Sequence, residues 1–279
     1  MKQAYYENEW QGLILSEIGG RSDAPAGIRF YRDFYDRLHG GDGRIAREGS
    51  VARSDWIAQK RNVGLRMTET LGRHGLTPMT RQRVLAVGAG SAFAEEVLLE
   101  AGYTVDCFDC QTTSLQAFRT RRAATALLVG DVERLPVAAS AYGGVTCVAV
   151  EYALDDSGYA RMMREIARVL VPGGILTLVS ASNLAARDVL LAWPRRLKRQ
   201  ANSSRSKGRP VMWGYRRSVD GHVRCATAAG LDVLELIGLT RSGEVVWTRK
   251  PRTLDRFIGF TSSTQLLLAC IRPFHQSRR

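Results

Sequence analysis

After residue 83 the hydrophobic positions follow two alternating rhythms. Short apolar runs rich in β-branched residues are separated by segments of 10 to 15 residues in which apolar positions recur every three or four residues. The strand-like runs are RVLAV (83–87), TVDCFD (104–109), TALLV (125–129), GVTCVAV (144–150) and GILTLVS (174–180). Strands that alternate with helices in this way predict βαβ units, and therefore an α/β fold with a parallel sheet.

The pattern continues to the end of the chain. YARMMREIARVLV (159–171) carries an amphipathic stripe and ends at the turn residues of Pro172–Gly174. SVDGHVRCATAAG (218–230) predicts another helix, and LDVLELIGL (231–239) and TQLLLACIR (264–272) predict two more strands. We therefore expect one main domain over residues 81–279, with a basic inserted segment at 186–217.

Residues 1–80 lack this strand rhythm. GIRFYRDFYDRL (27–38) and SDWIAQKRNVGLRMTETLGRHG (54–75) place apolar residues at helical spacing, the second with Ser54 as N-cap and Gly75 just past its end. We interpret residues 1–80 as a helical N-terminal extension. Tyr5 and Tyr6 either form a lid over a ligand or pack on the main domain.

Charge is the unusual part of the composition. The chain has a net charge of +13, while its 45% hydrophobic content is ordinary and no apolar run is long enough to cross a bilayer. We expect a cytoplasmic protein, with peripheral contact to an anionic membrane as an option.

No acidic residue lies between Val189 and Val219. Nine basic residues lie there: Arg195, Arg196, Lys198, Arg199, Arg205, Lys207, Arg209, Arg216 and Arg217.

A glycine turn follows the first strand of the main domain. Gly88 and Gly90 allow a tight turn and close approach of a ligand, and Asp109 at the end of the next strand suits the two hydroxyls of a ribose. Dinucleotide-binding turns place a third glycine where this chain has Phe93. The bulky ring argues against a pyrophosphate at the helix N-terminus.

Further motifs appear in a fixed order. GDVERLP places Asp131 after the third strand, VEYALDD places Glu151 after the fourth, and RVLVPGG leads into the fifth. Over residues 80–180 the sequence resembles class I S-adenosylmethionine (SAM)-dependent methyltransferases. The segment MWGYRRS resembles, less specifically, methyltransferases that act on bacterial surface glycans. The first resemblance implies a Rossmann-like sheet of seven strands with helices on both faces and the last strand antiparallel.

The resemblance also implies a set of cofactor-binding residues. The turn Val87, Gly88, Ala89 and Gly90 borders the methionine part of SAM, Asp109 and Cys110 hold the ribose, Asp131 and Val132 receive the adenine, and Glu151 lies at the edge of the site. Two positions depart from the family pattern. Ala92 replaces the usual third glycine of this turn, and Tyr152 replaces a frequent histidine.

The candidate catalytic residues are Glu151, Tyr152 and His222, of which Glu151 either orients an acceptor or only bonds to nearby backbone. His222 either borders the pocket or lies exposed on its helix. Asp155 and Asp156 are more typical of a helix N-terminus. Histidines and cysteines show no metal-ligand spacing, and we expect no metal.

Three functions remain open from the sequence. We favour a methyltransferase that methylates an oxygen of a small-molecule, sugar or lipid-linked glycan acceptor, since phosphate in such an acceptor would suit the basic segment. An RNA methyltransferase also explains the charge, but no RNA-binding module is recognisable. A catalytically silent binding protein would be expected to lose Gly88, Gly90, Asp109 and Asp131, which are all present.

Overall fold

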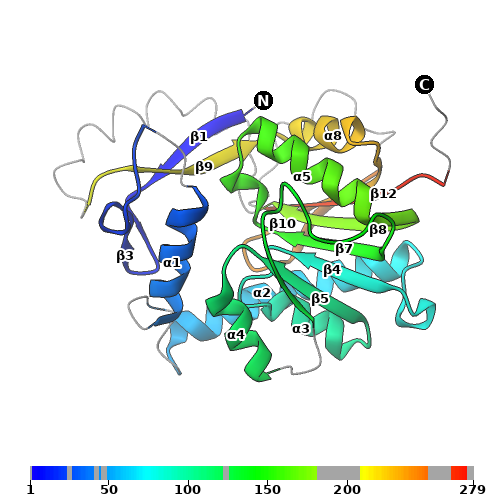
Figure 1. Cartoon of the computed structure of the whole chain (residues 1–279), viewed down its shortest axis with the longest axis horizontal. Helices are drawn as coiled ribbons and strands as arrows, with labels where there is room; N and C mark the ends of the chain where they lie inside the picture. Colours follow the sequence, from blue (N-terminus) through cyan, green and yellow to red (C-terminus); the bar gives the residue numbers. More distant parts are fainter. Residues whose placement is uncertain are drawn as a thin grey trace.

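The computed structural model describes residues 2–23, 27–40, 44, 49–121, 126–180, 208–250 and 265–274. An eight-stranded sheet forms its centre, in the order β11-β10-β12-β8-β7-β4-β5-β6 (Figure 1). Its strands are β4 (Arg83–Val87), β5 (Thr104–Asp109), β6 (Leu127–Val129), β7 (Tyr142–Val148), β8 (Leu170–Ser180), β10 (Asp232–Leu239), β11 (Val245–Arg249) and β12 (Gln265–Ile271).

The five strands from β6 to β8 are parallel, as predicted, and the last strand runs against them. β12 pairs antiparallel with both β8 and β10, and β11 pairs antiparallel with β10. The seven-strand prediction is wrong by one strand, because Val245–Arg249 extends the edge of the sheet. Most of its residues are exposed or half-buried, so it lacks the apolar run that marks a strand in a sequence.

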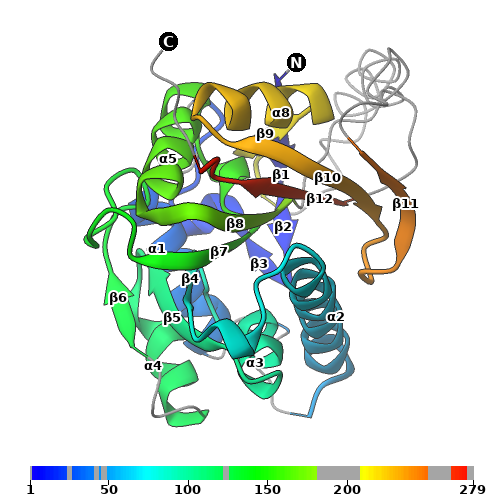
Figure 2. The ribbon, with the colours of Figure 1, turned by 90° about the vertical axis from the view of Figure 1, so that its right-hand side faces the viewer.

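Helices cover both faces of the sheet (Figures 1 and 2). The helices α5 (Asp156–Val169) and α8 (Val219–Ala228) pack on one face. On the other face lie α2 (Val51–Arg73), α3 (Phe93–Glu100) and α4 (Thr112–Arg121). Each face therefore buries its own hydrophobic core, as expected for a doubly wound sheet. No helix within the described ranges is long and apolar enough to cross a bilayer.

The N-terminal part is not purely helical, which corrects the prediction for residues 1–80. It begins with β1 (Lys2–Glu7) and the short pair β2 (Glu9–Trp10) and β3 (Leu13–Ile14), before the predicted helix α1 (Ile28–Gly40). β1 pairs antiparallel with β9 (Val211–Arg217) in a separate two-stranded ribbon. Because β1 is polar and its partner lies about 200 residues away, the local pattern gives no sign of this pairing.

The helix α2 forms where predicted but starts earlier. Its N-cap is Ser50, whose hydroxyl accepts a hydrogen bond from the Arg53 N–H at 3.2 Å, rather than Ser54. Gly75 follows the helix end with φ of +91°. Of the predicted insertion at 186–217, residues 186–207 lie outside the described residues, and the remainder forms β9 and the turn before it.

An aromatic cluster joins the ribbon to the main domain. Trp213 of β9 stacks between Trp10 and Tyr152, with ring centroids at 6.3 and 6.2 Å. Tyr31 of α1 donates a hydrogen bond from its hydroxyl to the Trp213 carbonyl at 2.6 Å. The cluster thus fixes α1 and β9 against the short 3-10 helix η3 (Glu151–Ala153) that follows β7.

The contact between α2 and α3 depends on a buried glycine. A Cβ atom on Gly64 would lie 2.3 Å from the Ala94 carbonyl oxygen. We expect Gly64→Ala to lower the free energy of unfolding by about 1–3 kcal/mol, because one of the helices must move. In the same helix a Cβ on Gly72 meets nothing closer than 3.9 Å. Gly72→Ala should therefore stabilise the protein, by up to about 1 kcal/mol. Denaturant titrations of both variants would check these opposite signs.

Candidate functional site

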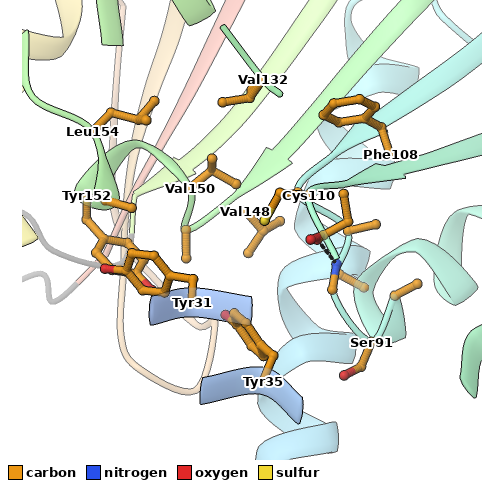
Figure 3. Close-up of a pocket in the computed structure, with 18 of the residues that line it drawn as sticks. Tyr31, Tyr35, Ser91, Phe108, Cys110, Val132, Val148, Val150, Tyr152 and Leu154 are labelled. Atoms are coloured by element: carbon orange, nitrogen blue, oxygen red, sulfur yellow. Dashed lines mark hydrogen bonds between the residues drawn. The ribbon is translucent and has the colours of Figure 1, made fainter. Parts of the chain in front are cut away.

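A cavity of about 330 Å³ opens at the carboxyl ends of the parallel strands. Ligands bind at this edge in open α/β sheets because the loops that follow the strands meet there. The loops after β4, β5, β6 and β7 line it on the sheet side, and residues of α1 and α2 close it from the opposite side (Figure 3). The predicted cofactor residues Gly88, Ala89, Gly90, Asp109, Cys110, Asp131 and Val132 all line this cavity.

The glycine turn is shaped by its neighbours. Gly88 has φ of +68°, and a Cβ atom there would lie 2.0 Å from the Val150 side chain. No larger residue fits between β4 and the end of β7. Ala92, in place of the expected glycine, also takes a left-handed conformation with φ of +56°. This conformation costs a non-glycine residue on the order of 1 kcal/mol. Val87 is buried in the strand below and does not line the cavity.

Asp109 is tied to this turn. Its Oδ2 accepts a hydrogen bond from the Gly90 N–H at 2.8 Å, and its Oδ1 accepts one from the Gln111 N–H at 3.2 Å. Burial raises the pKa of the carboxyl, and the bonds from Gly90 and Gln111 act in the opposite direction. Hydrogen bonds from the Cys110 side chain and backbone lower this pKa as well. The carboxylate is thus held in place before any ligand arrives.

The start of α3 and the facing side of α2 form a second wall. Phe93 lies at the first position of α3 and packs edge-on against Trp56 of α2, with centroids 5.5 Å apart. Beside them the cavity is lined by two residues of opposite charge, Lys60 and Glu95. Burial raises the pKa of Glu95 to about 7 and lowers that of Lys60, and each charge partly offsets the shift of the other.

At the opposite end the loop after β6 contributes Asp131 and Val132. Asp131 Oδ1 accepts a hydrogen bond from the Glu133 N–H at 2.9 Å, which closes the turn locally. Arg161 of α5 donates to Glu133 at 2.5 Å and is paired on the rim of the cavity.

Three tyrosines form the remaining wall (Figure 3). Tyr31 and Tyr35 come from α1, and Tyr152 comes from η3. Burial raises the pKa of all three hydroxyls, and a hydrogen bond from Tyr152 moderates the shift at the two residues of α1. All three tyrosines therefore stay neutral over the ordinary pH range.

Of the three candidate catalytic residues, only Tyr152 lines the cavity. Glu151 is buried behind Tyr152, and its carboxyl oxygens have no hydrogen-bond partner at ordinary geometry. Burial raises the pKa of this carboxyl, while the nearby Ser180 hydroxyl and Arg217 lower it. The structure thus places Glu151 under the site, not in it.

His222 is neither exposed nor at the pocket. It is fully buried between α8 and α5, with Nδ1 hydrogen-bonded to the Tyr159 hydroxyl at 2.9 Å. Burial lowers its pKa to about 3. The expectation of an exposed side chain is wrong, because His222 lies on the apolar stripe of α8 with Val219 and Ala226.

The structure does not place Tyr5 and Tyr6 as a lid, and it buries two residues of the segment that was expected to be a basic surface. Tyr5 packs beside Tyr152 with ring centroids 6.5 Å apart, and neither Tyr5 nor Tyr6 lines the cavity. Trp213 is buried in the aromatic cluster. Arg217, which the charge count assigned to a basic surface, is also buried and donates to the carbonyls of Glu151 and Leu154 at 2.7 and 2.6 Å.

The lining residues that sequence reasoning missed include five with aromatic or charged side chains from the N-terminal helices or the first turn of α3. They are Tyr31, Tyr35, Trp56, Lys60 and Glu95. The paired aromatics of α1 at helical spacing were a usable signal for one face of a helix. No pattern indicated which part of the main domain that face would meet. Within the described residues no cluster of His, Cys, Asp or Glu suits a metal ion.

Comparison with known proteins supports the resemblance seen in the sequence. Residues 85–178 match a family described as "Methyltransferase domain". An uncharacterized methyltransferase of Mycobacterium tuberculosis is 34% identical over 122 residues, which cover 44% of this chain and 47% of the relative. A malonyl-[acyl-carrier protein] O-methyltransferase of Erwinia pyrifoliae is 29% identical over 136 residues, covering 48% and 50%. The chain thus spans about half the length of these curated relatives.

Solved structures share the fold at low identity. A SAM-dependent methyltransferase from Methanosarcina mazei gives a TM-score of 0.52 at 16% identity, covering 70% of this chain and 93% of its own. A glycopeptide N-methyltransferase complexed with sinefungin gives 0.52 at 17%, covering 78% and 94%. The chain therefore has the Rossmann-like fold of SAM-dependent methyltransferases, and its residues 85–178 match the methyltransferase-domain family.

Proposed function

We propose that the protein is a SAM-dependent methyltransferase that acts on a small-molecule acceptor. The observation that carries this proposal is the Asp109 carboxylate, fixed by the Gly90 N–H at the end of β5 and facing the cavity. A ribose placed there presents two hydroxyl donors to the two carboxylate oxygens. Asp131 and Val132 lie on the same wall and suit the adenine.

The shape of the cavity favours SAM over a dinucleotide. Phe93 occupies the first turn of α3, where a pyrophosphate would need backbone N–H groups and a small residue. When bound, SAM supplies an electrophilic methyl group on a sulfonium. The residues of the chain bind it, orient it and exclude water from the transfer, which depends mainly on alignment.

The amino-acid end of SAM carries an ammonium and a carboxylate. Lys60 and Glu95 line the cavity next to the glycine turn and carry the complementary charges. We assign the carboxylate to Lys60 and the ammonium to Glu95. A bound ammonium favours the ionised form of Glu95, so binding of SAM should also lower a pKa that burial has raised.

The acceptor enters from the tyrosine wall. Relatives with named substrates methylate an oxygen in one case and a nitrogen in another, as their descriptions state. The sequence alone favoured an oxygen of a sugar or lipid-linked glycan. However, Glu151 and His222 do not reach the cavity, which removes two of the three groups expected to assist a hydroxyl. RNA is the second candidate, supported only by the basic composition.

Substitution of Asp109 tests the cofactor. We expect SAM and S-adenosylhomocysteine (SAH) to bind the wild-type protein with micromolar affinity. Asp109→Asn should weaken this binding about tenfold because the charge is lost. Asp109→Ala should abolish it. Calorimetric titration measures the affinities, and Asp232→Asn at the exposed start of β10 is the control. Full affinity in Asp109→Ala, or binding of NADH with no binding of SAM, would contradict the proposal.

Glu95 should also give the stability of the free protein a pH dependence. The pKa of Glu95 is about 7 in the folded protein, against 4.5 for an unperturbed glutamate. Between these two values the folded protein therefore holds a proton that the unfolded chain loses. This group therefore lowers stability as pH rises from about 4.5 to 7. Glu95→Gln should remove that contribution. The difference in free energy of unfolding between wild type and variant should therefore change as pH rises across this window. A difference that stays constant would show that Glu95 is not held protonated.

The acceptor class can be measured directly. Protein incubated with SAM labelled in its methyl group should transfer label into the small-molecule fraction of a cell extract and bind bulk RNA only weakly, without methylating it. RNA binding should fall steeply with added salt because it depends on surface charge. Label in RNA alone would reverse this ranking, and SAM binding with no transfer to any fraction would favour a silent binding protein.

A further inference from the structure

The tyrosine wall of the cavity carries information about the atom that receives the methyl group. Tyr31 and Tyr152 are each 7% exposed, and Tyr35 is half-buried. Their side chains converge on the end of the cavity that faces the loop after β7 (Figure 3). The other residues at this end are apolar, including Ala153 and Leu154. An acceptor there meets aromatic faces and phenol oxygens.

The hydroxyl proton of Tyr31 is directed away from the acceptor. Tyr31 donates it to the Trp213 carbonyl at 2.6 Å, behind the cavity. Because a hydroxyl has one proton and two lone pairs, Tyr31 can only accept a hydrogen bond from a ligand. The wall is therefore better suited to a group with N–H or O–H donors than to a carboxylate.

Among the described residues, this wall has no base for a hydroxyl acceptor. Burial raises the pKa of all three tyrosines, so none is ionised near neutral pH. The nearby carboxylate, Asp155, accepts bonds from the Gly158 N–H and the Ser157 hydroxyl at 2.7 and 2.8 Å, which lower its pKa and cap α5. An alcohol must lose its proton to become a good nucleophile, whereas a neutral amine attacks with its own lone pair.

Charge disfavours a carboxylate acceptor on separate grounds. Among the described residues, five carboxyl groups and two basic groups line the cavity. Arg161 and Glu133 pair with each other, which leaves four carboxyl groups and Lys60. The carboxyl groups are Glu95, Asp109, Asp131, Glu133 and Asp155. An anionic acceptor would be repelled, while a positive charge formed during the reaction would be stabilised by these groups and by the aromatic faces.

On the basis of the proposed function, we propose that the acceptor is an amine, and that Tyr31, Tyr35 and Tyr152 orient its nitrogen. The tyrosine oxygens accept its N–H groups, and the lone pair points toward the sulfonium. The ammonium form of the acceptor first releases one proton to water. The lone pair of the neutral nitrogen then forms a bond to the methyl carbon, and the carbon–sulfur bond breaks with its electron pair left on sulfur. The product is the methylammonium.

Three probes of matched shape test this assignment: benzylamine, benzyl alcohol and benzoate. Each is titrated by calorimetry into protein saturated with SAH, and each is incubated with labelled SAM. We expect benzylamine to bind, to be methylated, and to bind at least tenfold more tightly than the other two probes. Tighter binding of benzyl alcohol or benzoate, or failure of all three to bind, would overturn the assignment.

Two tyrosine variants separate orientation from folding. Tyr31→Phe and Tyr103→Phe each remove a hydroxyl that donates to a backbone carbonyl, at 2.6 Å to Trp213 and at 2.7 Å to Leu76, but only Tyr31 lines the cavity. Tyr31→Phe should weaken benzylamine binding roughly tenfold and leave SAH affinity unchanged. Tyr103→Phe should change neither affinity. An equal loss of benzylamine affinity in both variants would contradict the assignment. A wild-type protein that does not bind SAH would contradict the proposed function itself.

Discussion

The bond between the Asp109 carboxylate and the Gly90 N–H organises the site. It joins the end of β5 to the turn after β4, and this turn exists only because Gly88 leaves room for Val150 at the end of β7. Three adjacent strand ends are thus brought together by one charge-assisted hydrogen bond and one absent side chain. The ligand cavity is the space that this arrangement leaves open.

A second layer of structure completes the cavity from outside the sheet. The helix α1 and the ribbon of β1 and β9 meet η3 through stacked aromatic rings, and Arg217 fixes the backbone of η3 from behind. The Arg217 head group is 4.7 Å from the centre of the Tyr159 ring, which adds a cation–π contact under the site. The position of Tyr152 therefore depends on elements that are distant in sequence. This explains why the tyrosine wall is well packed although it lies outside the central sheet.

The sequence was sufficient for the sheet-side half of the site. Its periodicity and turns located the parallel strands, and the family motifs placed Gly88, Gly90, Asp109 and Asp131 where the cavity lies. It was insufficient beyond the strand ends. After Val148 the chain leaves the alternating geometry of a strand and then enters η3, so no periodicity tells whether Glu151 or Tyr152 faces the cavity.

The strands β1 and β11 were not predicted, for one shared physical reason. β1 and β11 are short or polar strands whose stability comes from partners far along the chain, and such pairing leaves little trace in local composition. His222 was misjudged for a different reason. A histidine is polar by composition, but this one occupies a core position of α8 and stays neutral through its bond to Tyr159.

The pairing of β1 with β9 has a consequence for biosynthesis. The first strand of the chain leaves the ribosome early, but its partner at Val211–Arg217 emerges only after the parallel part of the sheet has been made. Domains generally fold as units. The helix α1 also packs on Trp213 of β9, so it cannot reach its final position until that strand has been made. A ribosome-bound chain that ends before residue 211 lacks both the partner of β1 and the central ring of the aromatic cluster.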